Sequence, residues 1–393
     1  MPDASTPCPH SPSDPSQRVA VSRCGSYELS AVKAALRELL DNCGGVEAIF
    51  GGARSIALKV NLLSRTPPER AATTHPAIVT AFAQIICESG RRPIVIESPP
   101  GPYNAAVLRS FYSRCGIEEA AGAGGADLSY DTTVTRVSCP DGAASKSYNL
   151  IGAALNADAI VSLARLKTHA FMAMTGAVKN MFGCVPGMEK VEAHAHFADA
   201  ALFGEQLVDI CECVKPVFSV VDAVTAMEGE GPQSGVPRDV GLILGGRSPY
   251  NVDLAAAGLI GLKPSRVPAV AAAARRGLCP ETVGRLDIRG LGGPFGDVAV
   301  RDFRKASSTG MLARFGGMFG GRLVRALTPR PVVKPSACAG CGICAEHCPA
   351  QTIEMRGKAK IVHKKCISCF CCHELCPHKA INIHRNMIFK VLK

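Results

Sequence analysis

Cysteines at a regular spacing give this sequence its clearest chemical signal. The segments 338–349 (CAGCGICAEHCP) and 366–377 (CISCFCCHELCP) share the pattern C-x2-C-x2-C-x3-C-P, and each cysteine of the first copy recurs 28 residues later. A [4Fe–4S] cluster needs four thiolates: three closely spaced cysteines bind three irons, and the fourth comes from the other copy. Small residues such as Gly340 and Gly342 let the loop backbone approach the inorganic sulfides. We therefore predict two [4Fe–4S] clusters in the C-terminal part of the chain.

Residues 334–386 resemble the bacterial two-cluster ferredoxin module. That pattern implies that each cluster takes three cysteines from one copy and one from the other. One ligand set is Cys338, Cys341, Cys344 and Cys376, and the other is Cys366, Cys369, Cys372 and Cys348. Cys371 lies outside the repeated pattern and is interpreted as a thiol beside a cluster. Structural zinc and a disulfide framework are the alternatives, but the two proline-closed repeats fit zinc less well and no export signal favours disulfides.

A second group of polar side chains lies in segment 163–197, which is otherwise apolar or small in character. Lysine and histidine in such a setting suit an anionic ligand, proton transfer or a metal ion. The residues are Lys167, His169, Lys179, Asn180, Lys190, His194 and His196. Cys184 is either a thiolate ligand or nucleophile, or a small buried residue. His194 and His196 would share one side of a strand but not of a helix, which leaves a shared metal ion undecided.

Three further candidates end predicted strands. Lys59 and Asn61 close the strand 55–61, and Asp222 lies near the end of the strand 216–224. Ligands of parallel α/β sheets bind at the carboxyl ends of the strands, so the first two could contact an anion and the third could act as a base or metal ligand. A solvated lysine and a structural turn are the alternatives. The chain has no G-x-G-x-x-G after a strand, no Walker A loop and no G-x-S-x-G, so nicotinamide, classical ATPase and α/β-hydrolase functions lack support.

The elements that must position these residues alternate between β-branched runs and amphipathic helices. Strands are predicted at 18–23, 55–61, 92–99, 158–165, 216–224, 238–245, 286–291 and 297–303, and helices at 29–45, 76–90, 104–116, 204–213 and 250–277. Such alternation is typical of an α/β domain whose mostly parallel sheet is covered by helices on both faces.

Composition changes divide the chain into four segments. We expect a disordered tail (1–17), an α/β domain (18–306), a linker helix (307–333) and a small α+β ferredoxin-like domain with two clusters (334–393). The first segment is rich in proline and serine, and the third in glycine, arginine and large apolar residues.

Charge and composition exclude several classes of partner. The 44 Lys and Arg against 33 Asp and Glu give a formal charge of +11, but two oxidised clusters with their thiolates carry about −2 each and offset part of it. Aromatic residues are only 5%, tryptophan is absent and no nucleic-acid motif occurs, so no nucleic-acid partner is expected. No run of 18 apolar residues and no apolar signal core occur, so neither an integral membrane segment nor secretion is expected.

Four segments resemble the domain of unknown function 362 family over roughly residues 55–260. They are KVN (59–61), SLARLKTH (162–169), TGAVKNMFGCVPG (175–187) and VVDAVTAMEGEGP (220–232). The resemblance implies a cytoplasmic iron–sulfur protein, because some members similarly end in a two-cluster tail. It also implies shared, unspecified roles for Lys59, Asn61, Lys167, His169, Lys179, Asn180 and Asp222. Ala164 and Arg165 depart from the proline and lysine expected in that run.

We therefore predict an iron–sulfur oxidoreductase whose tail relays electrons between a redox partner protein, or a small electron donor, and an anionic substrate. Lys59, Lys167 and Lys179 would bind the substrate, with His169 as proton donor or acceptor and Asp222 orienting it or acting as base. The alternative is an electron-transfer or metal- or partner-binding protein without its own reaction, in which Cys184, His194 and His196 matter more. A third possibility is a non-redox α/β enzyme with a structural tail.

Overall fold

A computed structural model describes residues 14–197, 199–306 and 329–384. Their largest element is a nine-stranded sheet in the order β11-β1-β10-β9-β7-β2-β3-β4, with β8 paired to β7. The strands are β1 (Val19–Arg23), β2 (Ser55–Lys59), β3 (Arg92–Ile96), β4 (Asp127–Leu128), β7 (Ala159–His169), β8 (Ala173–Thr175), β9 (Phe218–Glu228), β10 (Val236–Gly246) and β11 (Ile288–Arg289). From β9 to β4 neighbouring strands of this order are parallel, while β10 is antiparallel to both β9 and β1.

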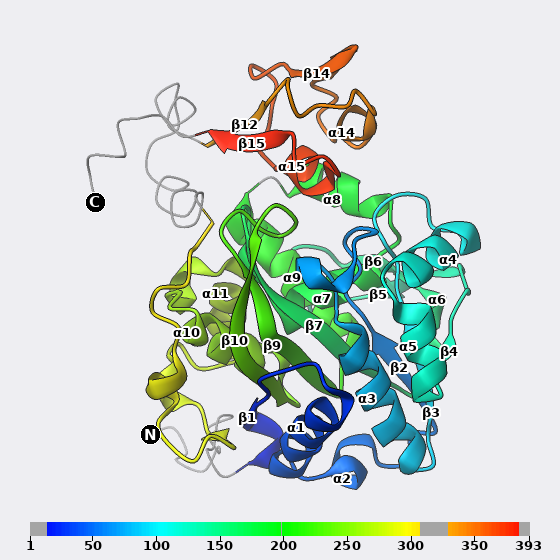
Figure 1. Ribbon diagram of the computed structural model, residues 1–393, viewed down its shortest axis with the longest axis vertical. Coiled ribbons are helices and arrows are strands. Elements are labelled where there is room, and N and C mark those ends of the chain that lie inside the picture. The colour runs from blue at the N-terminus through cyan, green and yellow to red at the C-terminus, as the bar shows by residue number, and fades with distance from the viewer. Residues whose placement is uncertain (1–13, 198, 307–328, 385–393) are drawn as a thin grey trace.

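Helices cover both faces of this sheet (Figure 1). One face carries α1 (Leu29–Asn42), α3 (Pro76–Glu88), α4 (Ala105–Arg114) and α5 (Ile117–Gly124), and the other carries α7 (Ala177–Met181), α9 (Ala200–Val214), α10 (Pro249–Leu259) and α11 (Pro268–Arg275). All eleven residues of the central strand β7 are buried, since both of its faces are covered. The predicted α/β fold with a mostly parallel sheet is confirmed.

Shorter elements complete the domain. They are the helices α2 (Val46–Phe50), α6 (Gly152–Leu155) and α8 (Glu189–His196), the hairpin of β5 (Val134–Ser138) and β6 (Ser147–Ile151), and the 3-10 turns η1 (Pro15–Gln17), η2 (Pro68–Arg70), η3 (Phe182–Cys184), η4 (Pro264–Arg266), η5 (Val283–Arg285) and η6 (Phe295–Val298). None of the helices in the described ranges has the length and apolar character needed to cross a membrane.

Several predicted boundaries need correction. The helix expected at 250–277 is two helices, because Pro264 and Pro268 start new segments. The strand expected at 297–303 is not formed, and η6 covers its start after Pro294. Of the expected disordered tail, residues 1–13 lie outside the described ranges, and 15–17 form η1, whose Gln17 carbonyl accepts a hydrogen bond from Asn251.

The C-terminal part folds into a small α+β domain. Its elements are β12 (Arg330–Val333), α14 (Ile343–Glu346), β13 (Ile353–Arg356), β14 (Lys358–Ile361), α15 (Cys371–Leu375) and β15 (Ile381–His384). β12 pairs antiparallel with β15, and β13 with β14. Residues 330–333, predicted as the end of a linker helix, are therefore a strand, since the β-branched Val332 and Val333 pair with β15; residues 307–328 of that prediction lie outside the described ranges.

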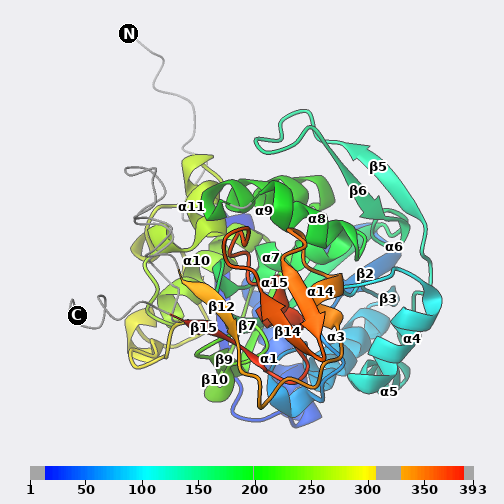
Figure 2. The ribbon, with the colours of Figure 1, turned by 90° about the horizontal axis from the view of Figure 1, so that it is seen from above.

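The small domain packs above the carboxyl ends of β7 and β2, with α15 nearest to the α/β domain (Figures 1 and 2). Phe370, directly before α15, is 1% exposed and belongs to the same apolar cluster as β7 and α9. The interface therefore brings α15 of the small domain next to the α/β domain.

Candidate functional site

The eight predicted ligand cysteines line two separate cavities in the small domain. The first, which we call the outer pocket, is lined by Cys338, Cys341, Cys344 and Cys376. The second, the inner pocket, is lined by Cys348, Cys366, Cys369 and Cys372. These are the two sets that the ferredoxin pattern implied, each with three cysteines of one repeat and one of the other.

The walls of the two pockets fit clusters that are held by thiolates. Among the described residues no group of three or more Cys, His, Asp or Glu side chains is placed to hold a single metal ion. The walls beside the cysteines are mostly apolar, for example Ile343 and Ala359 in the outer pocket and Ile361 and Phe370 in the inner one, which suits a cluster held by thiolates.

A third cavity, of about 80 Å³, lies between the two domains, and we call it the interdomain cavity. Because a water molecule occupies about 30 Å³ of liquid, this space holds a few waters or a small ligand. The α/β domain lines it with Lys179, Lys190 and His194, and the small domain with Cys371, Glu374 and Leu375. Leu63, Pro100, Phe182, Gly187 and Val191 complete the wall.

His194 presents a free acceptor at this cavity. Its Nδ1 lies 2.6 Å from the Lys190 carbonyl oxygen and so carries the proton, which leaves Nε2 as a lone pair. Nε2 is buried and has no hydrogen-bond partner among the described residues. Burial, and then the nearby Lys179, lower the pKa of His194 to about 4, so the ring is neutral.

His169 and Glu374 face each other across the domain interface. Their Nε2 and Oε1 atoms lie 3.1 Å apart, but they are not aligned for a hydrogen bond and neither has another partner in the described chain. His169 Nδ1 accepts from the backbone N–H groups of Phe171 and Met172, so the neutral ring carries its proton on Nε2, toward Glu374. Burial lowers the pKa of His169 and raises that of Glu374 to about 7.

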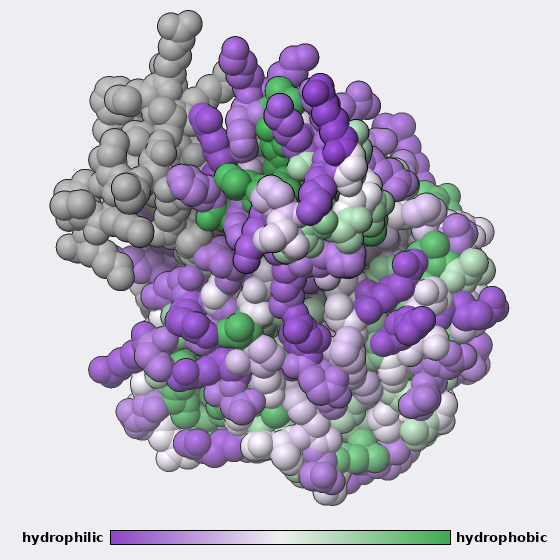
Figure 3. Space-filling view, turned by 45° about the horizontal axis from the view of Figure 1, so that its top comes forward, coloured by the Kyte–Doolittle hydropathy of each residue, from purple (hydrophilic) through white to green (hydrophobic). Residues whose placement is uncertain are grey.

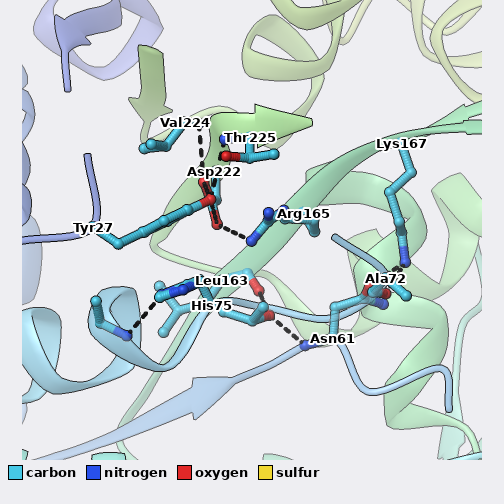
Figure 4. Close-up of polar contacts among 12 residues, drawn as sticks. Tyr27, Asn61, Ala72, His75, Leu163, Arg165, Lys167, Asp222, Val224 and Thr225 are labelled. Atoms are coloured by element: carbon cyan, nitrogen blue, oxygen red, sulfur yellow. Dashed lines mark hydrogen bonds and ion pairs between the residues drawn. The ribbon is translucent and has the colours of Figure 1, made fainter. Parts of the chain in front are cut away.

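Lys167 and Asn61 meet directly but are engaged with internal partners. The Lys167 ammonium donates to Asn61 Oδ1 and to the Ala72 carbonyl, both at 2.6 Å (Figure 4). Burial first, and the neighbouring cations Lys179 and Arg165 next, hold the pKa of Lys167 well below its usual range. Lys167 therefore ties β7 to the segment after β2 rather than opening into the interdomain cavity.

Lys59 forms a fully buried ion pair with Glu97. Its ammonium lies 2.6 Å from Glu97 Oε1 and donates also to the Val60 carbonyl. The other oxygen of Glu97 accepts from the Leu62 N–H at 2.8 Å. A side chain at Gly183 would collide with the lysine, because its Cβ would lie 2.3 Å from Lys59 Nζ. Glycine is thus required here for Lys59 to occupy its place.

Asn180 and Lys190 lie beside this pair. Asn180 Nδ2 donates to the Lys59 carbonyl at 3.0 Å and to Ser162 Oγ at 3.1 Å. Lys190 donates to the Ser98 carbonyl, and its burial lowers its pKa to about 7 although Glu97 opposes the shift. Lys190 thus links the buried polar residues to the wall of the interdomain cavity.

Asp222 lies elsewhere and does not orient His169, contrary to one of its two predicted roles. Its carboxylate accepts from Arg165 at 2.8 Å, from the Tyr27 hydroxyl at 2.9 Å and from the Val224 N–H at 3.1 Å (Figure 4). Arg165 and Asp222 are 1% and 0% exposed at their side chains, so the pair joins β7 to β9 inside the domain. Arg165, the departure from the family's lysine, supplies the guanidinium for this contact, and His75 stacks on Tyr27 with ring centroids 3.5 Å apart.

Cys184 and the two late histidines do not meet as a metal site. Cys184 is fully buried and burial raises its pKa to about 11, so its thiol keeps its proton at neutral pH. Because α8 is a helix, His194 and His196 point to different sides, and His196 is exposed in a separate surface cavity with Arg136 and Gln206.

Sequence reasoning missed Glu97 and Glu374. Glu97 directly follows β3, the parallel neighbour of β2, and its place at a strand end was the available signal. Glu374 stands between two cluster cysteines, and only the docking of the small domain places it near His169.

Two family models match the chain. The family described as "Domain of unknown function (DUF362)" matches residues 56–258, and the "4Fe-4S dicluster domain" matches residues 330–377. The thylakoid-associated protein sll1697 of Synechocystis sp. is 34% identical over 267 residues, which cover 67% of this chain and 80% of that protein. The lactate racemase apoprotein of Thermoanaerobacterium thermosaccharolyticum aligns with a TM-score of 0.38 and 12% identity, over 60% of this chain and 55% of that one.

Both resemblances seen in the sequence are confirmed by these family matches. The second match supports a capacity for iron–sulfur electron transfer through [4Fe–4S] clusters. The chain belongs to the DUF362 family, and it carries a [4Fe–4S] ferredoxin-type domain at its C-terminal side.

Proposed function

We propose that this protein is an iron–sulfur oxidoreductase that exchanges electrons with a small anionic molecule bound in the interdomain cavity. Two [4Fe–4S] clusters would be held by the outer and inner pockets, through the four cysteines of each. When bound, they would supply single electrons at low potential. The electrons would come from, or pass to, an external one-electron carrier.

The placement of α15 is the observation that carries this proposal. Cys372 of α15 lines the inner pocket, while Cys371 and Glu374 of the same short helix line the interdomain cavity. A molecule in that cavity would therefore lie one helix turn away from cluster ligands. Electron transfer between proteins needs no cavity between the two domains, so this space favours a reaction on a bound molecule over electron transfer alone.

The side chains around the cavity suit a small carboxylate. Lys179 and Lys190 can donate to its oxygens, and His194 Nε2 can accept a proton-bearing group of the same molecule. Glu374 lines the cavity and can give or take a proton there, and His169 Nε2 lies 3.1 Å from its Oε1. Lys179 thus keeps the binding role that the sequence analysis gave it, and Lys190 takes the role that was also given to Lys59 and Lys167.

A cytoplasmic location is part of the proposal. All described cysteines are free, and reduced thiols together with iron–sulfur clusters are typical of reducing compartments.

The test is substrate-dependent reoxidation. The reconstituted protein is reduced with dithionite, freed of excess reductant, and mixed with a panel of small mono- and dicarboxylic acids while its visible absorption and electron paramagnetic resonance spectra are followed. We expect some acids to reoxidise it, and Glu374→Gln or Lys179→Met to slow this about tenfold or more, because each removes a charged contact.

The chain offers matched controls for both variants. Glu346 occupies the position of Glu374 in the first cysteine repeat but is exposed, and Lys360 is exposed on β14. Glu346→Gln and Lys360→Met should leave the reoxidation rate unchanged. If no acid speeds reoxidation above the buffer rate, or if the cavity variants match their controls, the protein is an electron carrier without a reaction in this cavity.

A further inference from the structure

The mouth of the outer pocket has the composition of a small docking surface. Five residues that line this pocket are also exposed to solvent: Ala339, Cys341, Met355, Pro377 and His378. Met355 is 37% exposed, which is high for a large apolar side chain. Electron-transfer encounters use small interfaces, and protein interfaces in general place apolar groups at the centre and polar groups at the rim. We call these five residues the outer mouth.

Cations lie on the outer face of the β13–β14 hairpin, which borders the outer mouth. The hairpin turn packs on the first cysteine loop, since a Cβ on Gly340 would lie 2.2 Å from the Gly357 carbonyl and Lys358 donates to the Pro335 carbonyl at 2.5 Å. Met355 and Ala359 of the hairpin face the pocket, so the alternate residues Arg356, Lys358 and Lys360 lie on the outer side.

The exposed charges of the small domain are mostly positive. Within 330–384 the exposed cations are Lys334, Arg356, Lys358, Lys360, Lys364 and Lys365, and the exposed carboxylates are Glu346 and Glu354. Glu354 already pairs with Arg356 at 3.2 Å. Figure 3 shows this domain with long hydrophilic side chains around smaller apolar areas. A partner that covers the outer mouth therefore meets a surplus of positive charge.

The inner pocket offers no comparable surface. Phe370, which lines it, is packed into the core of the α/β domain, and α15 faces the interdomain cavity. Electrons exchanged with another protein would thus cross the surface at the outer pocket, where Cys341 is exposed.

We propose that the outer mouth and the β13–β14 hairpin form the docking surface for an acidic one-electron carrier protein. In each encounter one electron leaves the reduced carrier, which is oxidised, and enters this protein, which is reduced; no bond forms or breaks. Opposite charges would steer the encounter more than they would tighten the complex. The inference rests on the proposed function only in taking the small domain as the acceptor of electrons.

The test measures electron uptake without any substrate. The reconstituted full chain is mixed in a stopped-flow instrument with a reduced flavodoxin of net negative charge, and its reduction is followed by absorbance. The double variant Lys358→Glu with Lys360→Glu is compared with Lys263→Glu with Arg285→Glu, which makes the same charge change at exposed positions of the α/β domain. Iron content and electron paramagnetic resonance spectra verify that each variant holds its clusters.

We expect the flavodoxin to reduce the hairpin variant at about one tenth of the wild-type rate or below. The rate of the α/β variant should stay within about twofold of the wild-type rate. Binding of the oxidised flavodoxin, measured by calorimetry, should weaken in the same variant only. Rising salt should slow the wild-type reaction, because Debye screening shortens electrostatic steering. Reduction by the methyl viologen radical cation should not slow in the hairpin variant.

A wild-type rate that does not change with salt would overturn the docking proposal, and so would equal rates for the two charge-reversed variants. The salt series uses wild-type protein alone, so it stays decisive even if a variant folds poorly. Normal uptake from the flavodoxin with no acid able to reoxidise the protein would instead leave docking intact and refute the proposed reaction. The two failures are therefore distinguishable.

Discussion

The outer and inner pockets are built from the same cysteine pattern, yet their surroundings differ at nearly every position between the cysteines. The second repeat has Phe370 where the first has Gly342, and both residues precede a short helix with a left-handed backbone, at φ 62° and 79°. Glycine adopts that conformation without strain, whereas phenylalanine does not. The second repeat accepts the strain because the Phe370 ring anchors the small domain in the α/β core.

A second pair of equivalent positions shows the same division. Glu346 and Glu374 occupy the same place in the two repeats, but the first is exposed and the second is buried at the interdomain cavity. The two repeats thus share their cysteine spacing, while the residues between the cysteines leave one pocket at the surface and turn the other repeat toward the interdomain cavity.

The largest expected effect tests the anchor. Phe370→Ala should destabilise the protein by about 4 kcal/mol, because it removes a buried ring and leaves a cavity. The equivalent change Gly342→Ala should cost only about 1 kcal/mol when both variants are measured without clusters, since no protein atom lies within 4 Å of the new Cβ and only the left-handed backbone is strained. Denaturant unfolding, followed by circular dichroism or by the fluorescence of an attached label, measures the free energy of unfolding of both variants. Equal costs would show that the two repeats do not differ in anchoring.

The next prediction compares how the stability of the protein depends on pH through a lysine of the interdomain cavity and through a lysine of the outer hairpin. Burial lowers the pKa of Lys190 from 10.5 to about 7, so between pH 7 and 10.5 the unfolded chain binds a proton that the folded chain lacks. Stability of the wild type therefore rises with pH in this window, and the full cost of the buried ammonium is present below it. Lys190→Met should be more stable than wild type by about 3 kcal/mol at pH 6, with the difference fading toward pH 10.

Thermal unfolding at several pH values checks this expectation, with the exposed Lys360→Met as control. The control should follow the wild type at every pH, since an exposed ammonium gains nothing from removal. A Lys190→Met variant that is less stable than wild type at pH 6 would mean that the Lys190 ammonium is stabilised by its neighbours more than burial disfavours it.

The sequence predicted the chemistry within each domain better than the chemistry between them. The cysteine spacing indicated both ligand sets, because local repeats encode local loops, and the β-branched runs indicated the buried central strand β7. It did not indicate that His169 and Glu374, 205 positions apart, would meet, or that Asp222 would pair with Arg165 rather than serve His169. Such pairings depend on which sheet edge the small domain covers and on which side of β7 each residue points, and no periodicity encodes either.

The smallest expected effect compares the two pockets by reduction potential. Lys179 lies close enough to Glu374 and Cys371 to influence both electrostatically, and it lines the interdomain cavity together with these two residues of α15. Removing this cation makes an added electron less favourable nearby, so Lys179→Met should lower the midpoint potential of the cluster in the inner pocket. We expect a shift of roughly 30–60 mV, where about 59 mV corresponds to a tenfold change in the equilibrium constant for one electron. The midpoint potential of the cluster in the outer pocket should hardly change.

Lys358→Met, on the exposed hairpin, should shift the potential of the outer-pocket cluster by less than Lys179→Met shifts that of the inner-pocket cluster, because solvent and salt screen the exposed charge. A redox titration followed by electron paramagnetic resonance resolves the two. If Lys179→Met moved both potentials equally, or neither, the inner pocket would not be electrostatically coupled to the interdomain cavity, and the contrast between the pockets would reduce to their exposure alone.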